Sequence, residues 1–116
     1  MSSNAKPNDG KLPLTGDKFI DAFASDAIES QRRTGVPASV TLAQAILESG
    51  RGESGLSRNA KNFFGIKGEG PAGHVIMPTR EVFNGRSVMV DAEFRKYNTA
   101  AESFTDHGRF FLDNAR

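Results

Sequence analysis

The strongest constraint on the fold is a change in hydrophobic period along the chain. Up to about residue 60 the apolar side chains recur every three to four residues, as on one face of a helix. From about His74 to Phe94, apolar and polar residues alternate instead, which is typical of a half-buried strand. Helical spacing returns after Thr99. The sequence therefore predicts an α+β domain that is mainly helical and has one small antiparallel element.

The alternating segment divides into two β-rich runs, residues 77–83 and 86–94. Asn84 and Gly85 separate them, and both residues tolerate a positive φ angle. Asn-Gly between two alternating runs is the strongest short signal for a β-hairpin. A two-residue turn also fixes the register, and it places Glu81 opposite Val88.

Capping residues mark where the helices begin and end. The first helix is expected over 17–33, capped by Thr15 or Asp17 and stopped by Gly35. A second helix is opened by Pro37 and ends near Glu48. A short helix is expected within 51–61, capped by Ser54 or Ser57, and a last helix is opened by the capping box Thr99–Glu102.

Glu48 lies in the last turn of the second predicted helix and is followed at once by Ser49 and Gly50. Apolar residues surround this helix on nearly every side, so we expect it to lie deep in the domain. A last turn disfavours a carboxylate, because unpaired carbonyl groups make that end partly negative. Low polarity around Glu48 would disfavour its charged carboxylate as well, and would favour the protonated carboxyl group that a general acid needs. The alternative is a glutamate that points into solvent beyond the helix end.

Length and composition limit the class of protein. A chain of 116 residues forms one domain, which we place at 15–116, after a polar linker or tail over 1–14. The chain has no cysteine, which excludes disulfides and thiolate chemistry. His74 and His107 lie far apart in the sequence without a neighbouring His or Cys, so we expect no metal site and no cofactor.

Charge and hydropathy exclude further classes. A net charge of +1 argues against a nucleic-acid binder. No apolar run approaches the roughly 20 residues that span a bilayer, so we expect no membrane span. The start of the chain lacks the apolar core of a signal peptide, so any export signal is not in this chain. We expect a monomer.

Several residues near the glycine-rich segment 65–73 could contact a ligand. Its spacing of Gly65, Gly68 and Gly70 does not match a phosphate-binding loop, so we expect a mobile loop that binds no nucleotide. Phe63, Phe64 and Tyr97 could line a ligand site, with packing in the core as the alternative. His107 is expected to be half-buried or solvated rather than catalytic.

Four motifs occur in one order along the chain: Gly35–Ser54, Lys61–Lys67, Thr79–Gly85 and Phe94–Asp106. Together they resemble the glucosaminidase domains of glycoside hydrolase family 73. This family includes bacterial autolysins and the peptidoglycan hydrolase part of a flagellar rod protein. The resemblance runs from about Phe19 to Arg116.

The resemblance implies a lysozyme-like fold, with a helical lobe and a β-hairpin lobe across a cleft. It implies cleavage of the β-1,4 bond between N-acetylglucosamine and N-acetylmuramic acid in peptidoglycan strands, in the periplasm or the extracellular cell wall. The site residues that it implies are Glu48 as general acid, Glu81 as second carboxylate, Tyr97 lining the site, and Asn62, Phe63, Phe64 and Gly65 beside the cleft.

The chain departs from the family pattern at three places. Arg51 stands where the family usually has Trp, and Val82 where it often has Tyr. The family also usually continues with a further helix, so we expect this domain to be trimmed at its C-terminus.

The alternatives to a hydrolase are a non-catalytic glycan-binding or scaffold module of the same fold and a lytic transglycosylase. For a two-carboxylate mechanism, about 5–5.5 Å between the carboxyls indicates retention and about 6.5–9.5 Å inversion, while a substrate-assisted route needs Glu81 less.

Overall fold

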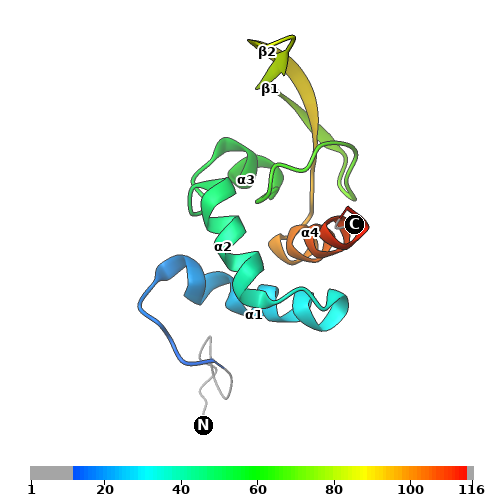
Figure 1. Ribbon diagram of the computed structural model, residues 1–116. Coiled ribbons are helices and arrows are strands. Elements are labelled where there is room, and N and C mark those ends of the chain that lie inside the picture. The colour runs from blue at the N-terminus through cyan, green and yellow to red at the C-terminus, as the bar shows by residue number, and fades with distance from the viewer. Residues whose placement is uncertain (1–11, 115–116) are drawn as a thin grey trace.

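The computed structural model describes residues 12–114, and Figure 1 shows a group of packed helices from which a β-hairpin extends. The predicted fold class, mainly helical with a single hairpin, is confirmed. In chain order the elements are α1 (Lys18–Thr34), α2 (Ala38–Ser49), α3 (Gly55–Ala60), β1 (His74–Phe83), β2 (Arg86–Arg95) and α4 (Ala100–Asp113).

The first helix begins and ends at the predicted residues. Asp17 Oδ1 accepts hydrogen bonds from the backbone N–H groups of Phe19 and Ile20, at 2.9 and 3.1 Å. Gly35 ends the helix in the left-handed conformation, at φ 82°, and donates its N–H to the carbonyl of Gln31. These contacts satisfy backbone groups that a helix end otherwise leaves unpaired.

The hairpin has the predicted register and turn. Glu81 pairs with Val88. Asn84 and Gly85 both have positive φ angles, 51° and 78°, as a two-residue turn of type I′ requires. Both strands are longer at the hairpin base than the predicted runs, because pairing continues to His74 opposite Arg95.

The core is a cluster of aromatic rings where α1, α4 and the segment after α3 meet. Phe63 lies at its centre, with its ring centroid 5.1 Å from Phe23 and 5.5 Å from Phe104. Edge-to-face pairs at these distances stabilise a core beyond the area that they bury. The buried apolar members of the cluster are Phe19, Ala27, Ala45, Phe63, Phe64, Ile66 and Phe104.

The expectation that α2 lies deep in the domain is wrong. One stripe of the helix, which includes Thr41, Ala45 and Ser49, is buried. The opposite side is open, with Leu47 79% exposed and Val40 38% exposed. The apolar pattern missed this because α2 packs with only one of its faces against α1 and α4. Within residues 12–114, no helix is long and apolar enough to cross a membrane.

The glycine-rich segment 65–73 does not hang free but follows β2. Gly68 N–H donates to the carbonyl of Glu93 at 2.9 Å, and Ala72 N–H donates to that of Lys96 at 3.0 Å. A Cβ atom on Gly70 would lie 2.9 Å from the backbone nitrogen of Lys96, so only glycine allows this close approach. The segment expected to be mobile is therefore anchored at the base of the hairpin.

Candidate active site

Glu48 lies in the last turn of α2 and is exposed, next to the buried stripe of the helix. The low-polarity surroundings expected from the sequence are therefore not found in the free protein. The helix ends directly after it, because Gly50 takes the left-handed conformation at φ 58°. Ser49 links the helix to the next turn, since its Oγ donates to the carbonyl of Ala45 and accepts from the N–H of Gly52 at 2.8 Å. These bonds fix the backbone that carries Glu48.

Arg51 continues the same tight turn, at the position where the family that the sequence resembles usually has Trp. It has φ 59°, an uncommon value for a residue other than glycine. Its guanidinium donates to Asp17 Oδ2 at 2.7 Å, and Asp17 caps α1. The ion pair connects the end of the Glu48 helix to the start of α1. The hydrogen bond from the Ile20 N–H lowers the pKa of Asp17 most, and the hydrogen bond from Arg51 lowers this pKa further. The aromatic surface is thus replaced by a polar contact between helices.

A groove of about 310 Å³ runs beside Glu48. Its walls come from α2, from the segment after α3 and from the second half of α4. The lining residues are Gln44, Glu48, Phe64, Ile66, His107, Phe110, Phe111 and Asn114. The groove therefore combines one carboxyl with an aromatic surface, which suits the apolar face and the polar edge of a sugar ring.

Two polar groups of this groove have no hydrogen-bond partner in the part of the chain that the structure describes. They are Oε1 of Gln44 and Nδ1 of His107, and both atoms are buried. His107 is 7% exposed, and its ring stacks on Phe64 with the centroids 3.9 Å apart. Burial lowers the pKa of His107, and the negative charge of Asp106 offsets this in part. The imidazole is thus neutral near pH 7 and able to hydrogen-bond a neutral ligand.

Glu81 is not among the residues that line this groove. It lies on the same face of the hairpin as Val75 and Met77, the face that is partly buried. Its carboxylate forms an ion pair with Lys67 of the glycine-rich segment. In the free protein the second proposed carboxylate is therefore held by a lysine, outside the groove that contains Glu48.

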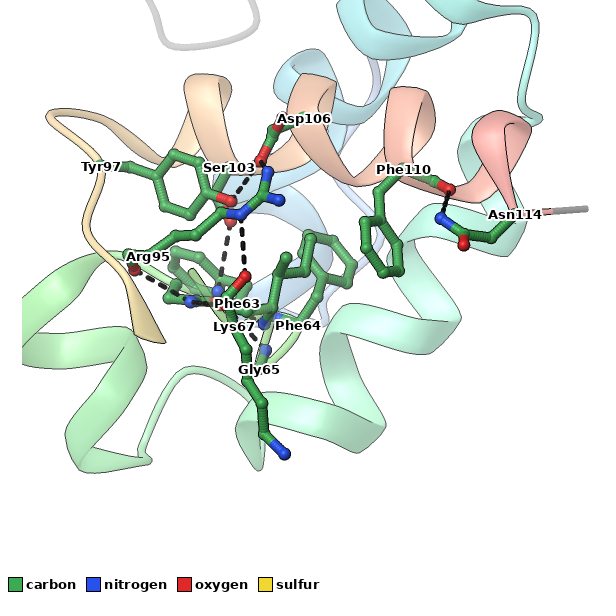
Figure 2. A network of polar contacts seen from close by, with 12 residues as sticks. Phe63, Phe64, Gly65, Lys67, Arg95, Tyr97, Ser103, Asp106, Phe110 and Asn114 are labelled. Carbon is green, nitrogen blue, oxygen red and sulfur yellow. Dashed lines mark hydrogen bonds and ion pairs between the residues drawn. The ribbon is translucent and has the colours of Figure 1, made fainter. Parts of the chain in front are cut away.

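Tyr97 lies in the segment between β2 and α4, and Figure 2 shows its hydroxyl directed toward Asp106. It is 2% exposed, and its hydroxyl donates to Asp106 Oδ2 at 2.5 Å. Arg95 donates to the same oxygen at 2.8 Å. Burial first, and then the hydrogen bond to Asp106, raise the pKa of Tyr97. Tyr97 is thus a buried donor that does not line the groove, and its predicted part in catalysis stays a prediction.

The Asn62–Gly65 motif is built around the side chain of Asn62. Its Oδ1 accepts from the N–H groups of Phe64, Gly65 and Ile66, and its Nδ2 donates to the carbonyls of Ile66 and Arg95, both at 2.9 Å. These bonds hold the turn that directs Phe64 into the groove. Phe63 lies in the core instead, and Gly65 is exposed at φ 69°. Of the four residues, only Phe64 is beside Glu48.

The sequence analysis did not single out Gln44, and it did not place His107 beside Glu48. A signal existed for Gln44, because residues four apart on a helix share a face. No local signal existed for His107, which reaches the groove only because α4 packs beside α2. The pairing of Lys67 with Glu81 likewise depends on how the glycine-rich segment folds against the hairpin.

A glucosaminidase family model, described as mannosyl-glycoprotein endo-beta-N-acetylglucosaminidase, matches residues 24–116. The chain is 44% identical over 94 residues to the exo-glucosaminidase LytG of Bacillus subtilis (strain 168), a match that covers 81% of this chain and 33% of LytG. It is 39% identical over 94 residues to a probable N-acetylmuramidase of Lactococcus lactis subsp. cremoris, which covers 80% of this chain and 22% of that protein.

Solved structures show the same fold. The catalytic domain of the autolysin Auto from Listeria monocytogenes has a TM-score of 0.75 and 31% sequence identity, over 87% of this chain and 60% of that one. The chain spans a third or less of the length of the two curated relatives named above. Because the family model matches most of the chain and the fold agrees, the chain belongs to the glucosaminidase family, glycoside hydrolase family 73.

Proposed function

We propose that this chain is the catalytic part of a peptidoglycan hydrolase that cleaves the β-1,4 bond between N-acetylglucosamine and N-acetylmuramic acid. The observation that carries the proposal is the position of Glu48, a carboxyl beside an aromatic groove in a chain of the glucosaminidase family. The relatives support the substrate class, since their names include an exo-glucosaminidase and a probable N-acetylmuramidase.

Glu48 is the proposed general acid. Glycoside cleavage needs a proton at the leaving oxygen as the oxocarbenium-like transition state forms. The exposed carboxyl at the end of α2 can reach a glycosidic oxygen bound in the groove. A sugar that fills the groove would also exclude water from this carboxyl, and desolvation favours its protonated form.

Glu81 is the proposed second carboxylate, and it would act after the hairpin moves. Its ion pair with Lys67 and its position outside the groove mean that the free protein is not set for a two-carboxylate reaction. Closure of a flexible element over bound substrate is a common way to complete an active site. A substrate-assisted route through the 2-acetamido group would leave Glu81 with a smaller role.

The proposal also covers partners and location. The partner is the glycan strand of peptidoglycan, so the protein works at the cell wall, in the periplasm or outside the cell. Tyr97 is proposed to support the site without lining the groove, because its hydrogen bond to Asp106 holds the segment between β2 and α4 in place. We propose that the domain over residues 15–116 acts as a monomer.

Analysis of the reducing ends released from peptidoglycan tests the proposal. We expect the chain to release new N-acetylglucosamine reducing ends, and we expect Glu48→Gln to release them about 10²–10⁴-fold more slowly. New N-acetylmuramic acid ends would instead assign muramidase activity, as in the name of the Lactococcus relative. Anhydro-muramyl ends would show a lytic transglycosylase. No release from a folded chain would show a module that binds glycan without cleaving it.

A further inference from the structure

The base of the hairpin brings together three side chains that could bind a metal ion. Glu69 comes from the glycine-rich segment, His74 begins β1, and Glu93 lies near the end of β2. One ligand atom from each lies within 4.8 Å of the others. All three residues are exposed, so an ion from solution can reach them.

The imidazole of His74 is already oriented by Glu69. Its Nδ1 lies 2.7 Å from Glu69 Oε1, at hydrogen-bond distance. The other ring nitrogen, Nε2, lies 3.9 Å from Glu93 Oε2 and is the atom that can bind an ion when Nδ1 donates to Glu69. A carboxylate that orients a histidine for metal binding is a frequent arrangement in proteins.

The gap between His74 Nε2 and Glu93 Oε2 is one that a single ion can bridge. Bonds of about 2.0–2.2 Å to zinc place two ligands of a tetrahedral ion about 3.4 Å apart. The observed 3.9 Å closes with a small rotation of the exposed Glu93 side chain.

The backbone that carries these ligands is fixed before any ion binds. Glu69 lies between Gly68, which donates its N–H to the carbonyl of Glu93, and Gly70, which packs against the backbone of Lys96. A preorganised set of ligands costs less conformational entropy on binding than a flexible one.

The negative charge of the cluster is not neutralised by lysine or arginine. Across residues 12–114, the ion pairs of Glu69 and Glu93 involve His74 alone. Lys67 and Arg95, which are close in sequence, pair with other carboxylates. Two carboxylates without a lysine or arginine partner attract a divalent cation.

We propose that His74 and Glu93 bind a divalent transition-metal ion of the zinc type, with Glu69 orienting the imidazole and water completing the coordination. A mixed imidazole and carboxylate set favours zinc over magnesium and calcium, which prefer oxygen ligands. The ion ties both strands together at the hairpin base and stabilises the folded form by mass action. The sequence pointed away from metal because Glu93 reaches His74 only through strand pairing, and Glu69 only through the fold of the glycine-rich segment.

Titration calorimetry with zinc chloride on the whole chain, in metal-free buffer, tests the site. We expect one site in the unsubstituted chain, no binding in His74→Ala, and at least about tenfold weaker binding in Glu93→Gln and in Glu69→Gln. Asp91→Asn is the matched control, because Asp91 is an exposed carboxylate two residues before Glu93 on the same strand. It should bind zinc as the unsubstituted chain does, and magnesium should bind to neither.

Any of three results would overturn the proposal. These are zinc binding in His74→Ala equal to that of the unsubstituted chain, no binding in the unsubstituted chain, or an effect of Asp91→Asn as large as that of Glu93→Gln. A second measurement needs no substitution. Cobalt(II) should broaden NMR signals first around residues 69, 74 and 93, and broadening centred elsewhere also overturns it. Glu48→Gln should bind zinc normally, so this result does not depend on the hydrolase proposal.

Discussion

At the scale of single residues, Glu48 combines exposure with a fixed backbone. We expect Glu48→Gln to lower the rate of glycan cleavage by about 10²–10⁴-fold, because the amide cannot deliver a proton. The melting temperature should change little, since the side chain is exposed. Reducing-end release and thermal unfolding measure the two effects. Glu53→Gln, on the exposed turn that follows, is the control and should keep full activity. Turnover like that of the unsubstituted chain in a folded Glu48→Gln variant would refute the assignment.

The hydroxyl of Tyr97 makes a structural hydrogen bond in the free protein. Tyr97→Phe removes the hydrogen bond to Asp106, and a buried bond to a charged group is worth about 1.5–3 kcal/mol. We expect a loss of stability of about that size, measured by urea unfolding. Turnover per folded molecule separates the two roles. A tenfold slower turnover without loss of stability would place the hydroxyl at the chemistry instead.

His107 makes stability depend on pH. Burial lowers its pKa in the folded state, so the unfolded chain binds a proton more readily. The free energy of unfolding should therefore fall as the pH drops through about 6.5, the usual value for histidine, and level off below the folded-state pKa.

His107→Phe tests this dependence, because it keeps a ring to stack on Phe64 but cannot be protonated. The fall in stability between about pH 7 and pH 5 should shrink in this variant. His74→Phe is the control and should keep the fall. Denaturant unfolding at a series of pH values in metal-free buffer makes the comparison, and identical pH profiles for His107→Phe and the unsubstituted chain would contradict it.

At the scale of elements, the hairpin is anchored at its base and open at its tip. Gly68 and Arg95 donate backbone hydrogen bonds that join the glycine-rich segment to β2. Near the turn, Val82 is 70% exposed and Phe83 is 56% exposed. A two-stranded ribbon without cover is only marginally stable, so opening should begin at the tip.

Amide hydrogen exchange measures this gradient. We expect the amides of residues 82–88 to exchange much faster than those of Gly68 and Arg95, and faster than the amide of Ala45 in α2. Lys67→Met, which removes the partner of Glu81, should speed exchange along the hairpin further. Uniform protection from base to tip, equal to that of α2, would argue against hairpin closure as the step that brings Glu81 to the groove.

At the scale of the whole molecule, Asp106 joins the hairpin to the helices. It lies on α4 and accepts hydrogen bonds from Arg95 and Tyr97, at the end of β2 and just after it. Asp106→Asn keeps the size but removes the charge, so we expect a loss of about 1–3 kcal/mol in the free energy of unfolding. Asp113→Asn, exposed on the same helix, is the matched control and should be nearly neutral. Equal effects of the two substitutions would show that Asp106 does not connect the two parts.

The sequence by itself determined the local structure. Asp17, Gly35 and Thr99 specify helix ends, and Asn84-Gly85 fixes the hairpin register. These signals suffice because caps and turns depend on atoms only a few residues apart. The resemblance on four motifs then gave the family, which the family model confirms.

Only the tertiary structure decided which surfaces meet. The apolar pattern of α2 could not show that one face stays open, or that Glu48 at the helix end is exposed. The sequence also could not show that Lys67 forms an ion pair with Glu81, or that Asp106 accepts a hydrogen bond from the Tyr97 hydroxyl. Burial and ion pairing depend on how elements distant in sequence pack against one another, and a local pattern does not encode that contact.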